Sequence, residues 1–147
     1  MSSGPASVSV DAPAKINLTL EILEERPDGY HNLRSVLIPV SLCDTVRVSA
    51  GAGDGDAIRC ETVGEGVDVG CLASLPPERH LAVRAARALA RAAGRSGPLR
   101  IDIVKRIPIG AGLGGGSADA AGTLVALDRL WGLGWPRPRL MEVGASI

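Results

Sequence analysis

Aromatic residues are almost missing from this sequence of 147 residues. It has no Phe, and apart from histidine its aromatic residues are Tyr30, Trp131 and Trp135. Any interior must therefore consist of Ala, Val, Leu and Ile, and the rows of aromatic side chains on which single-stranded nucleic acids stack are missing. The 16 Lys and Arg balance the 16 Asp and Glu, so the formal net charge is zero. Because a neutral chain has no bulk attraction for nucleic acid or for an anionic membrane, we expect neither as a partner.

Long apolar runs are missing as well. No segment approaches the ~20 apolar residues that cross a bilayer, and residues 1–15 lack the basic and apolar regions of a secretory signal peptide. The cysteines, Cys43, Cys60 and Cys71, show no C-x-x-C spacing, so we expect reduced, buried thiols instead of a zinc site. Reduced thiols and the lack of a signal peptide predict a cytoplasmic protein, and the length predicts one domain.

Alternating apolar residues predict strands in the N-terminal half. In residues 15–23 the apolar side chains from Ile16 to Ile22 point one way and polar ones point the other, which predicts a half-buried strand. Pro27-Asp28-Gly29 predicts the turn that follows, because Pro presets φ and Gly accepts a positive φ. The other expected strands span residues 7–10, 36–42, 44–49, 57–62 and 99–104.

Helical periodicity dominates the second half. Residues 78–95 and 117–131 predict two helices, and residues 136–143 predict the start of a third. Strands that come first and helices that come later favour an α+β fold with a mixed or antiparallel sheet.

Five of the seven residues from Gly110 to Gly116 are glycine, between a predicted strand and a predicted helix. Glycine is costly to order, and its use is close backbone approach or positive φ. A glycine-rich loop that enters a helix N-terminus offers free N–H groups and a positive dipole end, which suit a phosphate. Ser117 is placed either to cap the helix or to touch a phosphate or metal.

Two familiar phosphate loops fit this segment poorly. Gly110-x-Gly112-x-x-Gly115 matches the dinucleotide fingerprint, but the acid at about the required distance, Asp128, falls within a predicted helix and no second strand follows. The P-loop requires Gly-Lys-Ser/Thr, and this loop ends in Gly116-Ser117. A phosphate here must therefore take its cation from another part of the chain.

Only two of the sixteen basic residues are lysines, and both are candidates for that cation. Lys105 directly precedes the loop. Lys15 shares the polar face of a predicted strand with Asn17. The alternative is that Lys15 only protects the edge of the sheet against pairing with another strand. Tyr30-His31 after the turn is a further candidate pair, for which packing plus a surface imidazole is the alternative.

Three segments together carry a family resemblance: PAKINL at 13–18, RPDGYH at 26–31 and IPIGAGLGGGSAD at 107–119. They resemble the 4-diphosphocytidyl-2-C-methyl-D-erythritol kinase family of the GHMP kinase superfamily. The resemblance runs from about Val8 onward and covers the N-terminal half of such an enzyme. It implies that residues 1–147 form a GHMP kinase N-terminal, ATP-binding domain, truncated at its C-terminal end, with helices on one side of the sheet and the C-terminal domain absent.

The resemblance also implies ATP and Mg²⁺ as cofactors. The substrate would be a small molecule, cytidine diphosphate-linked methylerythritol, whose 2-hydroxyl accepts the γ-phosphoryl group of ATP in non-mevalonate isoprenoid biosynthesis. Lys15 would be the catalytic group beside that hydroxyl, and Ser117 would help to position Mg²⁺. Asn17, Tyr30 and His31 would hold the substrate, with Tyr30 stacked on its base. The implied ATP-binding residues are Lys105, Pro108, Ile109, Gly110, Ala111, Gly112, Leu113, Gly114, Gly115, Gly116, Ser117 and Ala118.

The sequence departs from this family at two places. His80-Leu81 stands where the family often has Asn-Leu, which changes the expected adenine contact. The family's catalytic Asp lies in a Gly-x-Asp-x-Pro segment just after a stretch like residues 144–147, where this sequence stops. A positioned general base contributes ~10²–10⁴-fold, so we expect the 147-residue polypeptide alone to be a very poor kinase. A non-catalytic nucleotide-binding remnant and a dinucleotide-binding oxidoreductase are the competing hypotheses.

Overall fold

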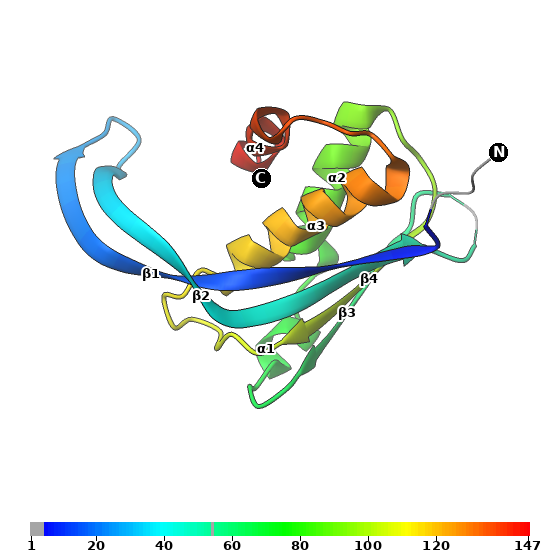
Figure 1. The fold of residues 1–147 in the computed structure, drawn as a ribbon, viewed down its shortest axis with the longest axis horizontal. Helices are drawn as coiled ribbons and strands as arrows, with labels where there is room; N and C mark the ends of the chain where they lie inside the picture. Colours follow the sequence, from blue (N-terminus) through cyan, green and yellow to red (C-terminus); the bar gives the residue numbers. More distant parts are fainter. Residues whose placement is uncertain (1–4, 54) are drawn as a thin grey trace.

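The chain, described over residues 5–53 and 55–147 of a computed structural model, is built on a four-stranded mixed sheet (Figure 1). The strands are β1 (Ser7–Glu25), β2 (His31–Ala50), β3 (Ile58–Gly64) and β4 (Leu99–Lys105), in the spatial order β1-β2-β4-β3. The β1–β2 and β2–β4 pairs are antiparallel, and β3 is parallel to β4. The predicted α+β class and mixed sheet are confirmed.

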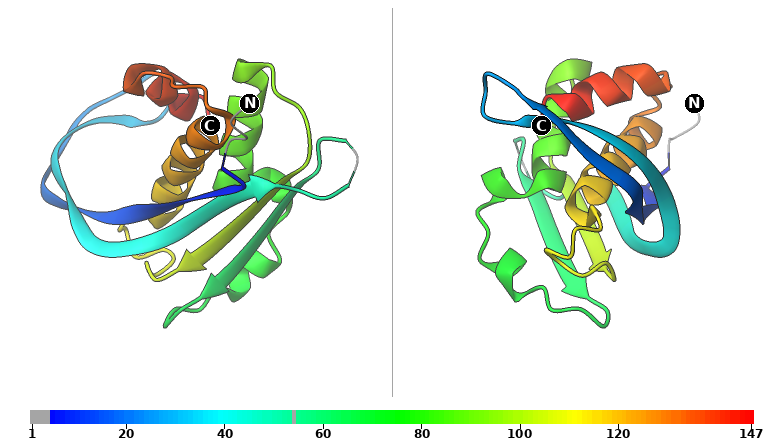
Figure 2. Two further views of the ribbon diagram at one scale, coloured as in Figure 1. Left: turned by 45° about the vertical axis from the view of Figure 1, so that its right-hand side comes forward. Right: turned by 90° about the vertical axis from the view of Figure 1, so that its left-hand side faces the viewer.

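Helices cover one face of the sheet, as predicted. The helical elements are α1 (Gly70–Ala73), the short 3-10 helix η1 (Pro77–Arg79), α2 (Leu81–Ala93), α3 (Gly115–Trp131) and α4 (Arg137–Ala145). Helices α2, α3 and α4 lie on the same side of the sheet in both views (Figures 1 and 2). The core between the layers is aliphatic, with Val46, Leu89, Ile101 and Leu127 fully buried. Within the described residues, no helix is long and apolar enough to cross a membrane.

The first two strands are much longer than the sequence predicts. The strands expected over 7–10 and 15–23 merge into β1, and those expected over 36–42 and 44–49 merge into β2. Prolines within both strands are tolerated because β1 lies at the sheet edge and β2 pairs with β4 only from Thr45 to Ala50. Beyond that point β1 and β2 form a two-stranded ribbon that leaves the sheet and bends (Figures 1 and 2).

The apolar face of this ribbon is exposed, so the predicted burial of one face of the strand over 15–23 is wrong. Leu18 is 59% exposed and Ile22 is 66% exposed. The cause is the placement of α3, which packs on β1 near Ala12, before the ribbon leaves the sheet. Two smaller expectations also change. His80 has an extended backbone and separates η1 from α2, which splits the expected helix over 78–95. Cys71 is exposed, whereas Cys43 and Cys60 are half-buried free thiols.

Candidate phosphate-binding site

The glycine loop joins the end of β4 to the start of α3. Helix α3 begins at Gly115, two residues before the predicted start, and its N-cap is Gly114 at φ +73°. The first intrahelical bond there runs from the N–H of Ala118 to the carbonyl of Gly114. The N–H groups of the preceding residues therefore point out of the first turn, where they can meet an anion. No side chain caps this helix, so the capping role considered for Ser117 is wrong.

Lys15 reaches this loop from β1. The register of β1 shifts between Pro13 and Lys15, and the backbone N–H of Lys15 donates to the carbonyl of Leu113 at 3.0 Å. Its Nζ donates to the carbonyl oxygen of Gly112 and to Asn17 Oδ1, each at 2.7 Å. The structure thus brings together the predicted catalytic lysine, Asn17 and the glycine loop, although 97 residues separate Lys15 from Gly112.

The backbone at Gly114 makes this approach possible. A Cβ at position 114 would lie 3.1 Å from Lys15 Cγ and 3.2 Å from its Cε, so the lysine stem lies directly on the glycine. The positive φ is a second reason why glycine suits the position. Among the described residues, the ammonium of Lys15 contacts only neutral oxygens. It is therefore the lysine whose charge is available to a phosphate.

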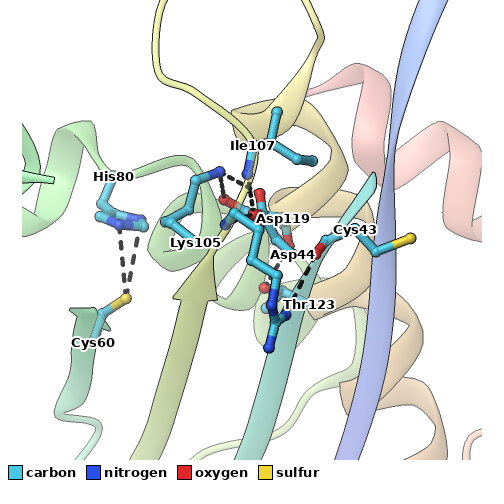
Figure 3. A network of polar contacts seen from close by, with 9 residues as sticks. Cys43, Asp44, Cys60, His80, Lys105, Ile107, Asp119 and Thr123 are labelled. Atoms are coloured by element: carbon cyan, nitrogen blue, oxygen red, sulfur yellow. Dashed lines mark hydrogen bonds and ion pairs between the residues drawn. The ribbon is translucent and has the colours of Figure 1, made fainter. Parts of the chain in front are cut away.

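A buried ion cluster holds both ends of the glycine loop (Figure 3). Lys105, which is 2% exposed, pairs with Asp44 and with Asp119, the latter at 2.8 Å between Nζ and Oδ2. Asp44 Oδ1 accepts hydrogen bonds from the backbone N–H groups of Arg106 at 2.6 Å and Ile107 at 2.8 Å. Since Asp44 fixes the residues that enter the loop and Asp119 lies in the following helix, the cluster sets the loop's entry and exit.

Helix α3 lies very close to this cluster at its first residue. A Cβ at Gly115 would come within 3.0 Å of both Lys105 Nζ and Ile107 Cγ2, so a side chain there would collide with the cluster. Lys105 also lines the cavity beside the loop. Its ammonium is already neutralised by two carboxylates, and its predicted contact with a nucleotide stays a prediction.

Burial and charge shift the pKa values of three groups at this site. Burial raises the pKa of Asp119 to about 6, although the Lys105 hydrogen bond works in the opposite direction. Burial disfavours the charge of Lys105, but hydrogen bonds and charges from Asp119 and Asp44 outweigh it and raise the Lys105 pKa. Burial, and then the charge of Lys105, lower the pKa of His80. At neutral pH Asp119 is therefore mostly ionised and Lys105 is charged, beside a neutral His80 imidazole.

The cavity beside the loop has polar and apolar groups in its lining. It has a volume of about 410 Å³, and residues 108–117 and Asp119 line it. Leu72, Leu75, Leu81 and His80 line it as well. The His80 ring nitrogens lie 3.8 and 4.0 Å from Cys60 Sγ, and burial raises the pKa of that thiol to about 11. The leucine side chains suit a flat ring, and the glycine loop suits phosphates.

The remaining predicted substrate residues lie elsewhere. Tyr30 and His31 are exposed at the tip of the β1–β2 ribbon, where His31 pairs with Glu25. The eleven residues of β1 from Lys15 to Glu25 are ten steps along the strand and span about 33 Å when extended. The bend of the ribbon shortens that distance (Figure 2). The structure therefore does not bring Tyr30 and His31 to the glycine loop, and their substrate contacts stay predictions.

Asp44 and Asp119 are the site residues that the sequence analysis missed. Asp119 stands within an Ala-rich helical pattern, and Asp44 opens what reads as a separate strand. Lys105, the lysine beside the loop, could have indicated them, because a lysine that is buried within an apolar strand needs carboxylate partners.

The structure around the loop does not fit a dinucleotide-binding fold. Asp128 lies in α3 and accepts a hydrogen bond from the backbone N–H of Trp135 at 3.0 Å. Helix α3 leads into α4, and no strand follows it in the described part of the chain. The loop therefore does not open the strand–helix–strand unit that a dinucleotide fingerprint requires.

Comparisons with known proteins agree with this geometry. Residues 80–147 match the family model of the GHMP kinases N terminal domain. A 4-diphosphocytidyl-2-C-methyl-D-erythritol kinase of Methylococcus capsulatus is 48% identical over 141 residues, which are 96% of this chain and 45% of that protein. The chain thus spans about 45% of the length of the curated relatives it matches.

Solved structures show the same fold. A crystal structure of a 4-(cytidine 5'-diphospho)-2C-methyl-D-erythritol kinase superposes with a TM-score of 0.69 at 37% identity, over 95% of this chain and 45% of that one. A homoserine kinase from Cytophaga hutchinsonii superposes with a TM-score of 0.70 at 20% identity, over 98% and 41% of the two chains. The chain therefore has the fold of a GHMP kinase N-terminal domain, and over almost its whole length it is similar to about 45% of the length of the 4-diphosphocytidyl-2-C-methyl-D-erythritol kinases.

Proposed function

We propose that residues 1–147 form the ATP-binding domain of a small-molecule kinase. Its reaction transfers the γ-phosphoryl group of ATP to the 2-hydroxyl of 4-diphosphocytidyl-2-C-methyl-D-erythritol, the substrate in the names of the relatives. One observation carries this proposal: Lys15 Nζ lies 2.7 Å from the Gly112 carbonyl, at the loop that offers its amides to phosphates. Phosphoryl transfer depends mainly on positioning and charge neutralisation, which a backbone loop and a nearby ammonium supply.

Each part of the cavity has a task in this proposal. The amides of the loop and of the first turn of α3 bind the phosphates, and the leucine side chains that line the cavity, Leu72 and Leu75, contact the base. The ammonium of Lys15 exchanges its carbonyl partner for a phosphoryl oxygen near the acceptor hydroxyl. Asn17 fixes that ammonium and is the nearest of the proposed substrate residues, whereas Tyr30 and His31 bind the cytidine part from the ribbon.

Mg²⁺ fits the residue types present in this cavity. Ser117 and Asp119 both line it, and their side chains carry the hard oxygen ligands that Mg²⁺ prefers. When bound, Mg²⁺ neutralises the charge of the phosphates. We propose Ser117 as a residue that holds it.

The partners and the location follow the same proposal. The ligands are small molecules, ATP and the cytidine diphosphate-linked substrate. A cytoplasmic location is supported by the free thiols of Cys43, Cys60 and Cys71.

Ligand binding to this chain tests the proposal. Calorimetry with ATP and Mg²⁺ should give a one-to-one complex that NAD does not form, and Lys15→Met should weaken it. A chain that binds NAD but not ATP contradicts the proposal. The transfer of labelled γ-phosphate to the methylerythritol substrate then separates a kinase domain from a module that only binds nucleotide.

A further inference from the structure

The buried cluster under the glycine loop is not electrically balanced. Asp44 and Asp119 contribute two negative charges and Lys105 contributes one positive charge, so one negative charge remains within the described contacts. All three side chains are at least nine-tenths buried, with exposed fractions of 0–5%. A buried net negative charge beside a phosphate site opposes the binding of a free polyphosphate.

Asp119 also has an oxygen without a partner. Its Oδ2 accepts a hydrogen bond from Lys105, but its Oδ1 is buried and has no hydrogen-bond partner among the described residues. Every oxygen of Asp44 is bonded, to Lys105 or to the backbone N–H groups of Arg106 and Ile107. Since a buried polar atom without a partner is costly, its presence in a residue that lines a cavity points to a ligand.

The position of Asp119 identifies the kind of ligand. Asp119 lines the same cavity as the amides of the loop and Ser117. Those amides attract anions, which the carboxylate repels. A divalent cation bound to a polyphosphate satisfies both, because it places positive charge next to the carboxylate while the phosphates meet the amides.

We propose that Asp119 is the carboxylate that faces the nucleotide-bound Mg²⁺, directly or through one of the waters that Mg²⁺ keeps. This inference rests on the proposed function, since it requires that the cavity binds a nucleotide. Asp119 makes the site select the metal complex over the free nucleotide, and Lys105 holds its other oxygen so that Oδ1 remains free for the metal.

The substitution Asp119→Asn separates this role from general nucleotide binding. The amide keeps the size of the side chain and removes the charge. The test is the affinity for ADP in calorimetry, once with Mg²⁺ and once with EDTA. In the unaltered chain Mg²⁺ should tighten ADP binding, and Asp119→Asn should reduce that gain by about 10-fold while the affinity for free ADP is equal or tighter. Asp11→Asn, which alters an exposed carboxylate on β1 outside the cavity, is the matched control and should keep the full gain.

The outcomes are distinct. If the unaltered chain binds no ADP under either condition, the proposed function is wrong and this inference is wrong with it. If it binds ADP and Asp119→Asn keeps the full Mg²⁺ gain, the inference alone is overturned.

A second measurement uses the unaltered chain and does not depend on the variant folding. Mn²⁺ replaces Mg²⁺ in the ADP complex, and the broadening of carboxyl carbon signals is recorded by NMR. Asp119 Cγ should be broadened more strongly than Asp44 Cγ, although both carboxylates contact the same ammonium. Equal or weaker broadening at Asp119 overturns the inference.

Discussion

Asp119 should reduce the stability of the chain when no metal is bound, and removing its charge should raise that stability. Burial raises its pKa to about 6 from an ordinary value of 3.8. A change of that size disfavours the ionised form in the fold by about 3 kcal/mol at neutral pH. Because an amide resembles the protonated carboxyl in shape and charge, Asp119→Asn should raise the free energy of unfolding by up to about 3 kcal/mol at pH 7.5.

The pH dependence of this effect has a definite sign. The folded chain holds a proton on Asp119 up to about pH 6, whereas the unfolded chain loses it near pH 4. The folded state therefore binds more protons between these values, and the contribution of Asp119 to stability falls as pH rises through this window. The advantage of Asp119→Asn should be small at pH 4, grow up to about pH 6 and stay constant above it.

Urea unfolding at pH 4.5 and pH 7.5 measures this difference, with Asp44→Asn as the matched control. Asp44 accepts two backbone N–H groups as well as the Lys105 ammonium. The same chemical change there should lower stability by about 3–5 kcal/mol, because the amide oxygen can still accept the two backbone N–H groups but the NH₂ group then faces the buried Lys105 ammonium, which loses a charged acceptor. A loss of more than about 1 kcal/mol for Asp119→Asn at pH 7.5 contradicts the account, since it means that the charge of Asp119 stabilises the fold.

Three other substitutions test separate parts of the site, and a fourth, Gly134→Ala, is a control outside it. Lys15→Met should weaken ATP binding by about 10-fold or more in calorimetry, because it removes a charged donor at the loop. An unchanged affinity for ATP would mean that Lys15 only protects the edge of the sheet. Gly114→Ala should lower the melting temperature and weaken ATP binding, because φ is +73° and the new Cβ meets the Lys15 stem. Gly134→Ala, also at positive φ but in open space, should lower only the melting temperature. Lys105→Met should cost about 3–5 kcal/mol in urea unfolding, because it leaves two buried carboxylates without their cation, and a change below 1 kcal/mol contradicts the ion cluster.

The sequence predicted the fold class because its local patterns are strong. Helix α4 begins at Arg137, one residue after the predicted start, and α3 ends at Trp131 as predicted. The long ribbon was missed because Pro13 interrupts the alternating pattern of β1 and because the segments of β2 read as separate strands. Only the position of β1 at the sheet edge explains why Pro13 is tolerated. The exposure of Leu18 depends on which part of β1 the helices reach, which no local pattern contains.

The candidate site was predictable only in part, for the same reason. The glycine loop is local in the sequence, and its composition indicated phosphate binding. The contact between Lys15 and Gly112 joins residues 97 positions apart, so only the family resemblance related them before the structure was known. Asp119 was missed because one carboxylate in an Ala-rich helix reads as a surface residue, and its burial depends on Lys105 and Asp44.

NMR of the ¹⁵N-labelled chain during titration with ATP and Mg²⁺ tests most directly whether Lys15 and the glycine loop bind a triphosphate together. The account predicts that the largest chemical-shift changes occur at the amides of residues 110–116 and of Lys15, whose N–H bonds to Leu113. NAD should leave these signals unchanged. If the loop amides stay unchanged with ATP, or if NAD shifts them equally, the loop and the lysine do not form a triphosphate site.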